Sequence, residues 1–444
     1  MHVLALDLGT SSARARLLDA AGRFVEGAEA RRRYRDDGGT FGAEELVAAA
    51  RAVLAEARSQ APAPEAAVGV SCFWHSLVAL DEHERPLTPV LGWNDVRSAE
   101  QARRLRERLD PVAVHVRTGC ALHPSYWPAK LAWLRETEPE TWARARRFVP
   151  FPDLLLLREA GELRTSLSQA SATGLWTDDG WDAELLDELG LRPEQLPEVC
   201  DDPAAGWFPA LGDGACSNLG TGCTTRERGA VMIGTSAALR VMHGDRSARP
   251  RPGLFRYRLD ADRVVEGGSL SDGGNLYAWL ERTLRLPDDA RLAERAPAGH
   301  GLTFLPLLGG ERSPGWTIGS RGAVAGLSFA TTPEDLLQAA LEGVALRFAE
   351  IADRLPELQE VVATGGALAQ NDDWAQILAD VLGLPVRRGV REGSARGAGV
   401  YALERLGAAA GVAPVGDAFE PRLDRAEAYR WARERQRDLY RGVT

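Results

Sequence analysis

The sequence predicts an α/β protein made of two duplicated domains that face each other across a central cleft. Short apolar runs alternate with amphipathic stretches along the 444 residues. The segment Leu6-Asp-Leu-Gly-Thr-Ser11 matches Val231-Met-Ile-Gly-Thr-Ser236 at an offset of 225 residues, which is close to half of the chain. Because no low-complexity linker separates the halves, we expect domains at 1–227 and 228–444 to pack against each other.

The first half is predicted to begin with a three-stranded meander. Residues 13–18 alternate apolar side chains with Arg14 and Arg16, which is the period of a half-buried strand. An amphipathic helix and a short buried strand follow the meander. The predicted order is three strands, a helix and a strand, at residues 3–8, 13–18, 23–28, 44–58 and 68–73.

The second half is predicted to repeat this opening and then to become helical. Thr332 precedes Pro333 and two acidic residues, a pattern that is typical of a helix start. A strand at 360–363 leads into Thr364-Gly-Gly366, and a helix is expected at 373–382. A second meander is expected from strands at residues 229–233, 237–242, 255–259 and 263–266.

Composition and charge exclude several classes of protein. No stretch approaches the roughly 18 apolar residues of a membrane span, and the N-terminus lacks the basic segment and cleavage site of a signal peptide. The net charge of −10 argues against a nucleic-acid partner, and the run Arg31-Arg-Arg33 is interpreted as a solvated face. The five cysteines have no metal or disulfide spacing. We therefore expect a cytoplasmic protein with reduced thiols.

The repeated turns predict two phosphate-binding loops, one in each half. Backbone N–H groups and small hydroxyl side chains in such a turn can surround phosphate oxygens. Asp7 directly precedes the first turn, where its carboxylate can hold Mg²⁺ directly or through water. An ordinary hairpin remains the alternative for each turn alone. The predicted phosphate-side residues are Thr10, Ser11, Ser12, Arg14, Gly234 and Thr235.

These motifs resemble those of the FGGY carbohydrate kinases, which are members of the actin-like ATPase superfamily. Gly322-Ala-Val-Ala-Gly-Leu327 and the segment 335–342 fit the C-terminal signature of that family. Lys130-Leu-Ala-Trp-Leu134 keeps the core of the N-terminal signature, although Trp127 and Thr137 depart from it. The resemblance implies two actin-like, ribonuclease H-like domains, with sugar bound by the first and nucleotide by the second. Lys130 is the one lysine of the chain, and its role is left open between substrate contact and hinge packing.

Within this family the sequence is most similar to the gluconate kinases. Trp74-His-Ser76, Trp93-Asn-Asp-Val-Arg97 and the segment 213–220 carry that similarity. Xylulose kinases share the acidic and basic residues of these segments, but they usually have Met-His-Gly where this chain has Trp74-His-Ser76. The resemblance implies that the sugar is contacted by Trp74, His75, Asp95, Arg97, His123 and Asp213.

The chemistry of these residue types suits a polyhydroxylated acid. Arg97 offers a bidentate fork for a carboxylate, Asp95 accepts from vicinal hydroxyls, and His75 donates or accepts according to its tautomer. Two alternatives remain: Arg97 could form a structural ion pair with Asp95, and His75 could be a satisfied histidine at a strand end.

Asp213 is the predicted catalytic base. It lies between Gly212 and Gly214, which allow a carboxylate to project while the backbone stays close to the substrate. Such a carboxylate can accept the proton of an attacking hydroxyl. A Gly-Asp-Gly turn without catalytic function is the alternative.

The nucleotide side is predicted in two glycine-rich segments. Thr364-Gly-Gly-Ala-Leu-Ala-Gln-Asn371 resembles the adenosine motif of the family, and the segment 308–314 resembles its loop beside the nucleotide. Adjacent glycines permit close approach of a backbone to a flat base or a ribose. A strand–helix loop without a ligand is the alternative. The residues expected to contact nucleotide are Gly309, Gly310, Gly365, Gly366, Ala367 and Asn371.

Together these features predict an ATP-dependent, Mg²⁺-requiring carbohydrate kinase. Its expected reaction is phosphorylation of the terminal hydroxyl of gluconate to 6-phosphogluconate, with no nucleic-acid or membrane partner. Another sugar or polyol such as xylulose is the main alternative, and a non-catalytic nucleotide-dependent sensor is a remote one. The sequence leaves the oligomeric state open between monomer and homodimer.

Overall fold

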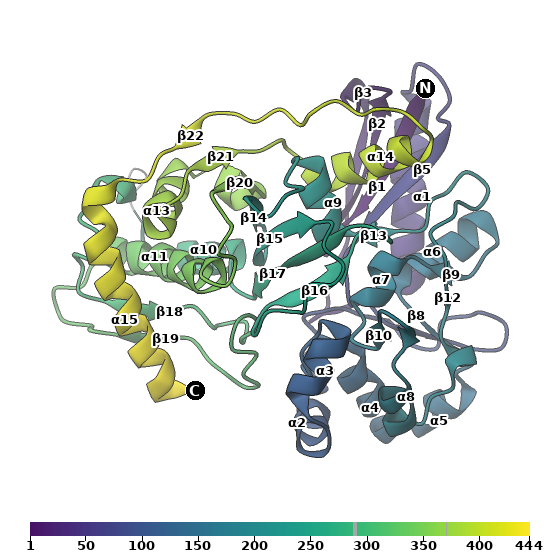
Figure 1. The fold of residues 1–444 in the computed structure, drawn as a ribbon, viewed down its shortest axis with the longest axis horizontal. Helices are drawn as coiled ribbons and strands as arrows, with labels where there is room; N and C mark the ends of the chain where they lie inside the picture. Colours follow the sequence, from purple (N-terminus) through teal and green to yellow (C-terminus); the bar gives the residue numbers. More distant parts are fainter. Residues whose placement is uncertain (287–290, 370) are drawn as a thin grey trace.

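A computed structural model describes residues 1–286, 291–369 and 371–444. Each half of the chain is built on its own β-sheet, and the two α/β bodies lie side by side (Figure 1). The predicted fold class, two duplicated α/β domains, is confirmed. No helix of the described ranges has both the length and the apolar character needed to cross a membrane. The five cysteines are free thiols, as expected.

The sheet of the first half confirms the first meander. Strand β1 pairs antiparallel with β2 on one side and parallel with β5 on the other, and β2 pairs antiparallel with β3. Residues 3–8 of β1 are all buried, because a central strand is covered on both faces. In sheet order the strands are β13 (Leu211–Gly212), β5 (Ala67–Cys72), β1 (His2–Leu8), β2 (Ser12–Asp19) and β3 (Phe24–Arg33).

The sheet of the second half repeats this pairing. Strand β14 pairs antiparallel with β15 and parallel with β20, as β1 does with β2 and β5. The internal duplication inferred from the two Gly-Thr-Ser turns is therefore present in the topology. In sheet order the strands are β16 (Phe255–Arg258), β17 (Val264–Leu270), β15 (Ala237–His243), β14 (Arg228–Ile233), β20 (Glu360–Thr364), β21 (Val386–Arg388) and β22 (Ala418–Phe419).

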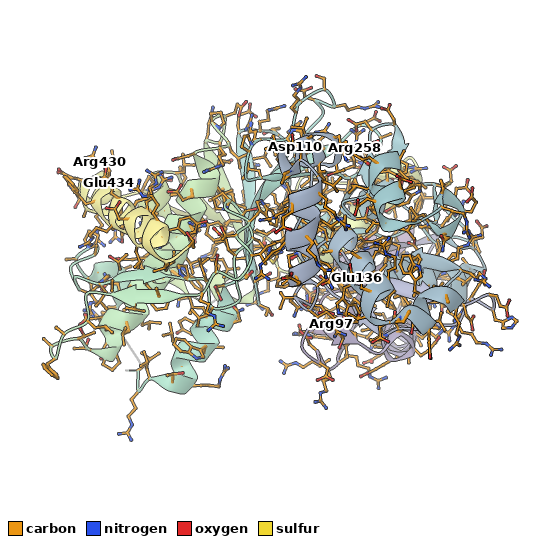
Figure 2. The ribbon with its side chains drawn as sticks, turned by 90° about the horizontal axis from the view of Figure 1, so that it is seen from below. Arg97, Asp110, Glu136, Arg258, Arg430 and Glu434 are labelled. Carbon is orange, nitrogen blue, oxygen red and sulfur yellow. The ribbon has the colours of Figure 1, made fainter. Side chains whose placement is uncertain are left out.

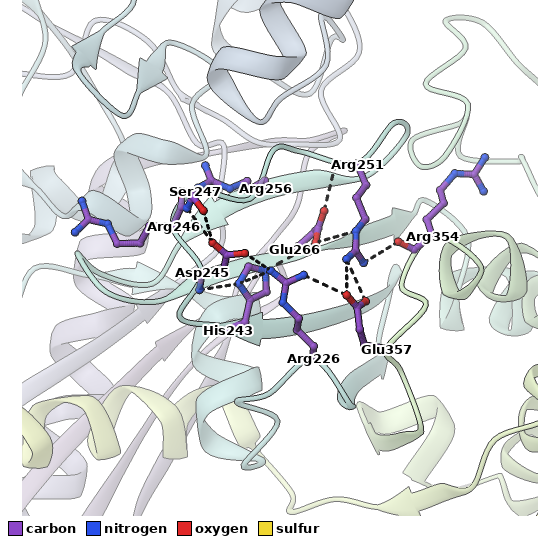
Figure 3. A network of polar contacts seen from close by, with 10 residues as sticks. All are labelled: Arg226, His243, Asp245, Arg246, Ser247, Arg251, Arg256, Glu266, Arg354 and Glu357. Atoms are coloured by element: carbon purple, nitrogen blue, oxygen red, sulfur yellow. Dashed lines mark hydrogen bonds and ion pairs between the residues drawn. The ribbon is translucent and has the colours of Figure 1, made fainter.

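The predicted order of the second meander is wrong in one respect. Strand β15 pairs with β17, and β16 lies at the edge of the sheet. Apolar periodicity identifies both strands of the β16–β17 hairpin but does not say which of them pairs with β15. The pairing brings His243 of β15 to 3.9 Å from Glu266 of β17, and Glu266 also accepts the Arg251 backbone N–H at 3.2 Å (Figure 3). The placement thus buries one polar network at the sheet end.

Helices cover both sheets, and one of them connects the halves. Helix α14 comes late in the sequence but packs on β1, β5 and α9 of the first half (Figure 1). A Cβ on Gly397 would lie 1.8 Å from the carbonyl oxygen of Cys216, so this contact needs a glycine. The predicted cap at Thr332 is confirmed, because its side chain accepts the Asp335 N–H. The helices are α1 (Ala43–Ser59), α9 (Asp213–Gly220), α10 (Gly274–Thr283), α11 (Pro333–Ala352), α12 (Gly366–Ala369), α13 (Asp372–Leu382), α14 (Gly393–Arg405) and α15 (Ala426–Val443).

The first half also carries a largely helical insertion between β5 and β13, which contains segments predicted on the sugar side. Its helices are α2 (Ala99–Arg108), α3 (Pro111–Thr118), α4 (Trp127–Thr137), α5 (Pro139–Arg144), α6 (Phe151–Ala160), α7 (Leu167–Ser171) and α8 (Ala183–Leu189). Short two-stranded sheets complete both halves of the molecule. In the first half their strands are β4 (Thr40–Phe41), β6 (Val78–Leu80), β7 (Val90–Leu91), β8 (Arg147–Val149), β9 (Arg164–Thr165), β10 (Trp176–Thr177), β11 (Gly180–Trp181) and β12 (Glu198–Val199). In the second half they are β18 (Thr303–Leu305) and β19 (Ala323–Ala325).

Candidate active site

The two Gly-Thr-Ser turns meet at a cavity between the halves. The cavity has a volume of about 550 Å³ and is lined by Thr10 from the first turn and Thr235 from the second. Gly309 and Gly310 line the same cavity. The carbonyl of Thr235 accepts the backbone N–H of Asn275 in the first turn of α10, which fixes this loop against a helix start. The cavity thus brings together two residues predicted on the phosphate side, Thr10 and Thr235, and two predicted beside the nucleotide, Gly309 and Gly310.

A second cavity of about 340 Å³ joins Asp7 and Arg14 to the glycines of the predicted adenosine motif, Gly365 and Gly366. Asp7 is buried, and its carboxylate accepts from Ser71 Oγ at 2.8 Å and from Arg14 Nη1 at 3.2 Å. Burial raises the pKa of Asp7, and the Arg14 charge and the Ser71 hydrogen bond oppose that rise. The paired carboxylate and guanidinium thus place both signs of charge in the lining of the smaller cavity.

The remaining residues of the phosphate and adenosine segments are placed as follows. Ser11 is exposed, whereas Ser12 is buried and its Oγ has no partner among the described residues. Ala367 lies in α12, and the Asn371 side chain caps α13 by accepting the Trp374 N–H at 2.9 Å. Gly365 has a positive φ of 91°, and a Cβ there would lie 2.4 Å from the Ile233 carbonyl oxygen. The strand–helix turn can therefore be made only by glycine.

Asp213 is the first residue of α9, at the carboxyl end of β13. The Trp74 indole covers both flanking glycines, because a Cβ on Gly212 would lie 1.8 Å from it and one on Gly214 2.4 Å. The glycines thus allow the ring to pack directly on the backbone beside the carboxylate. Asp213 Oδ1 accepts the Gly214 N–H at 2.8 Å.

The electrostatic surroundings of Asp213 suit a base that works near neutral pH. Burial, aided by the negative charge of Asp7, raises the pKa of Asp213 to about 6, and the charges of Arg240 and Arg312 oppose the rise. A general base is most effective when its pKa lies near the working pH. Arg312 lines the larger cavity and Asp7 the smaller, and the charges of both act on Asp213, which itself lines neither cavity.

The pKa of Asp213 predicts a pH profile. The base must be ionised, so kcat/KM for the sugar should fall about tenfold per pH unit below an inflection at about pH 6. The substitution Arg240→Met removes a charge that lowers this pKa, so its inflection should move to higher pH. Initial rates from pH 5 to 8 measure both inflections. A profile that is flat through pH 6, with chemistry limiting the rate, would contradict the assignment.

The two sugar-side histidines are buried and neutral, with opposite tautomers. His75 Nδ1 donates to the Ala172 carbonyl at 2.7 Å, which leaves Nε2 as an acceptor. His123 Nδ1 accepts the Ser125 N–H at 3.2 Å, which makes its Nε2 a donor. Burial lowers the pKa of each ring to about 3. His123 lines the larger cavity, whereas Trp74 and His75 line neither of the two cavities described above.

Asp95 and Arg97 form an ion pair. Arg97 Nε donates to Asp95 Oδ1 at 2.8 Å, and the guanidinium stacks over Trp133 at 5.0 Å from the ring centroid. The Arg97 side chain is 41% exposed, and Figure 2 places it in the first half of the chain. Arg97 does not line either of these cavities. The geometry therefore favours the structural alternative for this arginine.

Sequence reasoning missed three charged residues of the site. Arg312 and Arg240 are 8% and 3% exposed, and their charges act on Asp213. Asp272 is buried after β17, where its Oδ1 accepts the Gly309 N–H at 3.0 Å and holds that loop. A signal existed for Arg240, because it is a lone charge in the apolar strand 237–242. Arg312 lies in the segment 308–314, in which the glycines carry the sequence signal.

A duplicated α/β fold with one Gly-Thr-Ser turn in each half, both lining a cavity between the halves, is the arrangement of the actin-like phosphotransferases. Residues 2–204 match the N-terminal domain of the FGGY family of carbohydrate kinases, and residues 229–403 match its C-terminal domain. The chain belongs to this family, and it is an ATP-dependent carbohydrate kinase.

Individual relatives act on different sugars. The chain is 30% identical over 424 residues to a gluconokinase of Bacillus subtilis (strain 168), and the alignment covers 86% of this chain and 82% of the relative. It is 34% identical over 409 residues to a xylulose kinase of Streptomyces coelicolor, and that alignment covers 87% of this chain and 84% of the relative. The crystal structure of a gluconate kinase from Lactobacillus acidophilus superimposes with a TM-score of 0.89 at 24% identity, over 100% of this chain and 98% of that one. That last likeness shows the fold.

Proposed function

We propose that the chain transfers the γ-phosphoryl group of ATP to the terminal hydroxyl of gluconate and so forms 6-phosphogluconate. The observation that carries the proposal is Asp213, a carboxylate at the carboxyl end of β13 whose pKa is raised to about 6 and on which the charges of Asp7 and Arg312, one from each cavity, act. The Bacillus subtilis gluconokinase relative supports gluconate as the acceptor. The Streptomyces coelicolor relative supports xylulose as the second candidate.

In the proposed reaction Asp213 accepts the proton of the hydroxyl as that oxygen attacks phosphorus. Thr10 and Thr235 hold phosphate oxygens from opposite sides of the cleft, and Arg14 neutralises their charge. Gly365, Gly366, Ala367 and Asn371 form the adenosine side, with Gly309 and Gly310 beside the phosphates. Phosphoryl transfer needs alignment and charge stabilisation above all, and these groups supply both.

The residues present fit a Mg²⁺ ion. Mg²⁺ is usually held by one or two carboxylates together with substrate phosphates and water. Asp7 supplies a buried carboxylate at the smaller cavity, and Asp272 Oδ2 is a buried acceptor without a partner among the described residues. When bound with ATP, the ion would neutralise charge on the phosphate oxygens. Asp7 is the residue that we expect to hold it, directly or through water.

A panel of acceptors tests the proposed substrate. Gluconate, xylulose, ribitol and glycerol are each assayed with ATP and Mg²⁺ by coupled detection of ADP. We expect the highest kcat/KM with gluconate, and the product should carry phosphate on its terminal carbon. Turnover of xylulose with none of gluconate would reject gluconate, and turnover of no acceptor alongside tight ATP binding would favour the sensor.

A further inference from the structure

Lys130 is the one lysine among 53 basic residues, and it is 1% exposed. It lies in the first turn of α4, inside the helical insertion. Its ammonium does not line either of the cavities described above. Lys130 is therefore a buried cation outside those cavities, in a chain that otherwise uses arginine for its basic side chains. Its contacts show why a lysine occupies this position.

Those contacts join two loops of the sugar side. Lys130 Nζ donates to the carbonyl oxygen of His75 at 2.8 Å and to that of Leu91 at 3.5 Å. Trp127, one turn earlier on the same helix, donates from Nε1 to the next carbonyl of the first loop, that of Ser76, at 2.9 Å. The start of α4 thus holds two successive peptide groups of the loop that carries Trp74 and His75.

The held loop has an uncommon conformation. His75 has a φ of 68°, in the left-handed region that residues other than glycine seldom adopt. Such a conformation persists only where the surrounding structure enforces it. Because the His75 carbonyl is the group that Lys130 grips, the ammonium fixes the peptide from which the imidazole projects. The ring then lies 4.9 Å from Tyr126 and 5.6 Å from Tyr257, between centroids.

A carboxylate faces the same ammonium from the second loop. Burial lowers the pKa of Lys130 to about 7. The negative charge of Asp95 opposes this fall, because it stabilises the ammonium form. Asp95 Oδ1 is occupied by Arg97, whereas its Oδ2 is buried without a partner among the described residues. A compact ammonium can serve two carbonyls and a nearby carboxylate in directions that a planar guanidinium fork cannot match.

We propose that Lys130 is a positioning residue for the sugar side of the active site, which joins the loops at His75 and at Leu91–Asp95 and thereby orients the His75 imidazole. The proposal rests on the sugar-kinase activity of the family and not on gluconate as the acceptor. It assigns the signature lysine to alignment of the acceptor, and it separates that role from contact with ATP.

The test compares Lys130→Met with a matched core variant, Leu134→Ala. Leu134 lies on the same helix, is 1% exposed and packs in the same apolar cluster as Trp127, and it carries no polar group that could bind the carbonyls held by Lys130. Each variant is assayed with whichever acceptor the wild type phosphorylates best. For Lys130→Met we expect kcat/KM for the sugar to fall about 10- to 100-fold, with KM for ATP within about twofold of wild type. For Leu134→Ala we expect a lower Tm and an unchanged KM for the sugar.

A double-mutant cycle with His75→Asn decides whether Lys130 acts through His75. If it does, the double variant should lose about as much kcat/KM as His75→Asn alone, since the losses are not additive. Additive losses, or a Lys130→Met variant that loses Tm but keeps its sugar kcat/KM, would overturn the proposal. Should Lys130→Met not fold, Lys130→Arg is judged by the same criteria, and wild-type sugar kinetics in it would equally overturn the proposal. Failure of every acceptor in the wild type would instead reject the proposed function.

Discussion

The substitution Asp213→Asn should lower kcat by about 10²- to 10⁴-fold while ATP affinity stays nearly constant. The amide keeps the size of the side chain and can still form a hydrogen bond to the sugar hydroxyl, but it cannot accept the proton at neutral pH. Sugar affinity should change modestly, because one charge-assisted hydrogen bond becomes a neutral one. The measurement is kcat at saturating ATP and sugar, with binding of each checked separately by calorimetry.

Asp262→Asn is the matched control for this prediction. Asp262 is an exposed aspartate in the turn of the β16–β17 hairpin, and the same chemical change there should leave kcat unchanged. The pH profile gives a second check, because the inflection near pH 6 should disappear with the carboxylate. If Asp213→Asn retains more than about a tenth of the wild-type kcat, with chemistry limiting the rate, another group is the base.

Much of the fold could be predicted because its signals are local. The apolar runs at 3–8 and 229–233, each ending in Gly-Thr-Ser, indicated the duplication, and β1 and β14 have the corresponding strand partners. The order of β16 and β17 was not predictable in the same way, since both have strand periodicity. Their positions depend on pairing with β15, and the packing of α14 on the first sheet likewise depends on contacts between distant segments.

In the candidate site, too, the residues with local sequence signals could be predicted, whereas those placed by long-range contacts could not. Asp213, Thr10 and Thr235 were named because glycine and hydroxyl residues mark them in the sequence. The cations that act on Asp213 were not named, because Arg240 and Arg312 are separated from it by 27 and 99 positions and only tertiary structure brings them near. Of the arginines, sequence pattern predicts Arg14, which the structure places at the smaller cavity, and Arg97, which the structure pairs with Asp95. Local pattern thus finds loops more readily than it finds the charges that surround them.

The substitution Arg312→Met should lower kcat/KM for the sugar by about 10²-fold, the second largest effect predicted after that of Asp213→Asn. The guanidinium lines the larger cavity, stacks over Trp93 at 4.2 Å and donates from Nη2 to the Leu270 carbonyl at 2.9 Å, while its buried Nε has no partner among the described residues. A fixed, desolvated donor beside developing charge commonly contributes about 10²- to 10³-fold. Steady-state kinetics with sugar and ATP varied in turn measure the loss.

Arg97→Met is the control for Arg312→Met, because both substitutions remove an arginine that could bind the acceptor. Arg97 is partly exposed and lines neither cavity, so loss of its ion pair with Asp95 should cost about 1 kcal/mol or less of stability and leave KM for the sugar nearly unchanged. Arg312→Met should also move the inflection of Asp213 to higher pH, because its charge lowers that pKa. A larger rise in KM for an aldonate in Arg97→Met than in Arg312→Met would identify Arg97 as the carboxylate ligand. The opposite result would mean that the acceptor is held by a cation from the second half, so that the sugar is bound only when both halves of the cleft contribute.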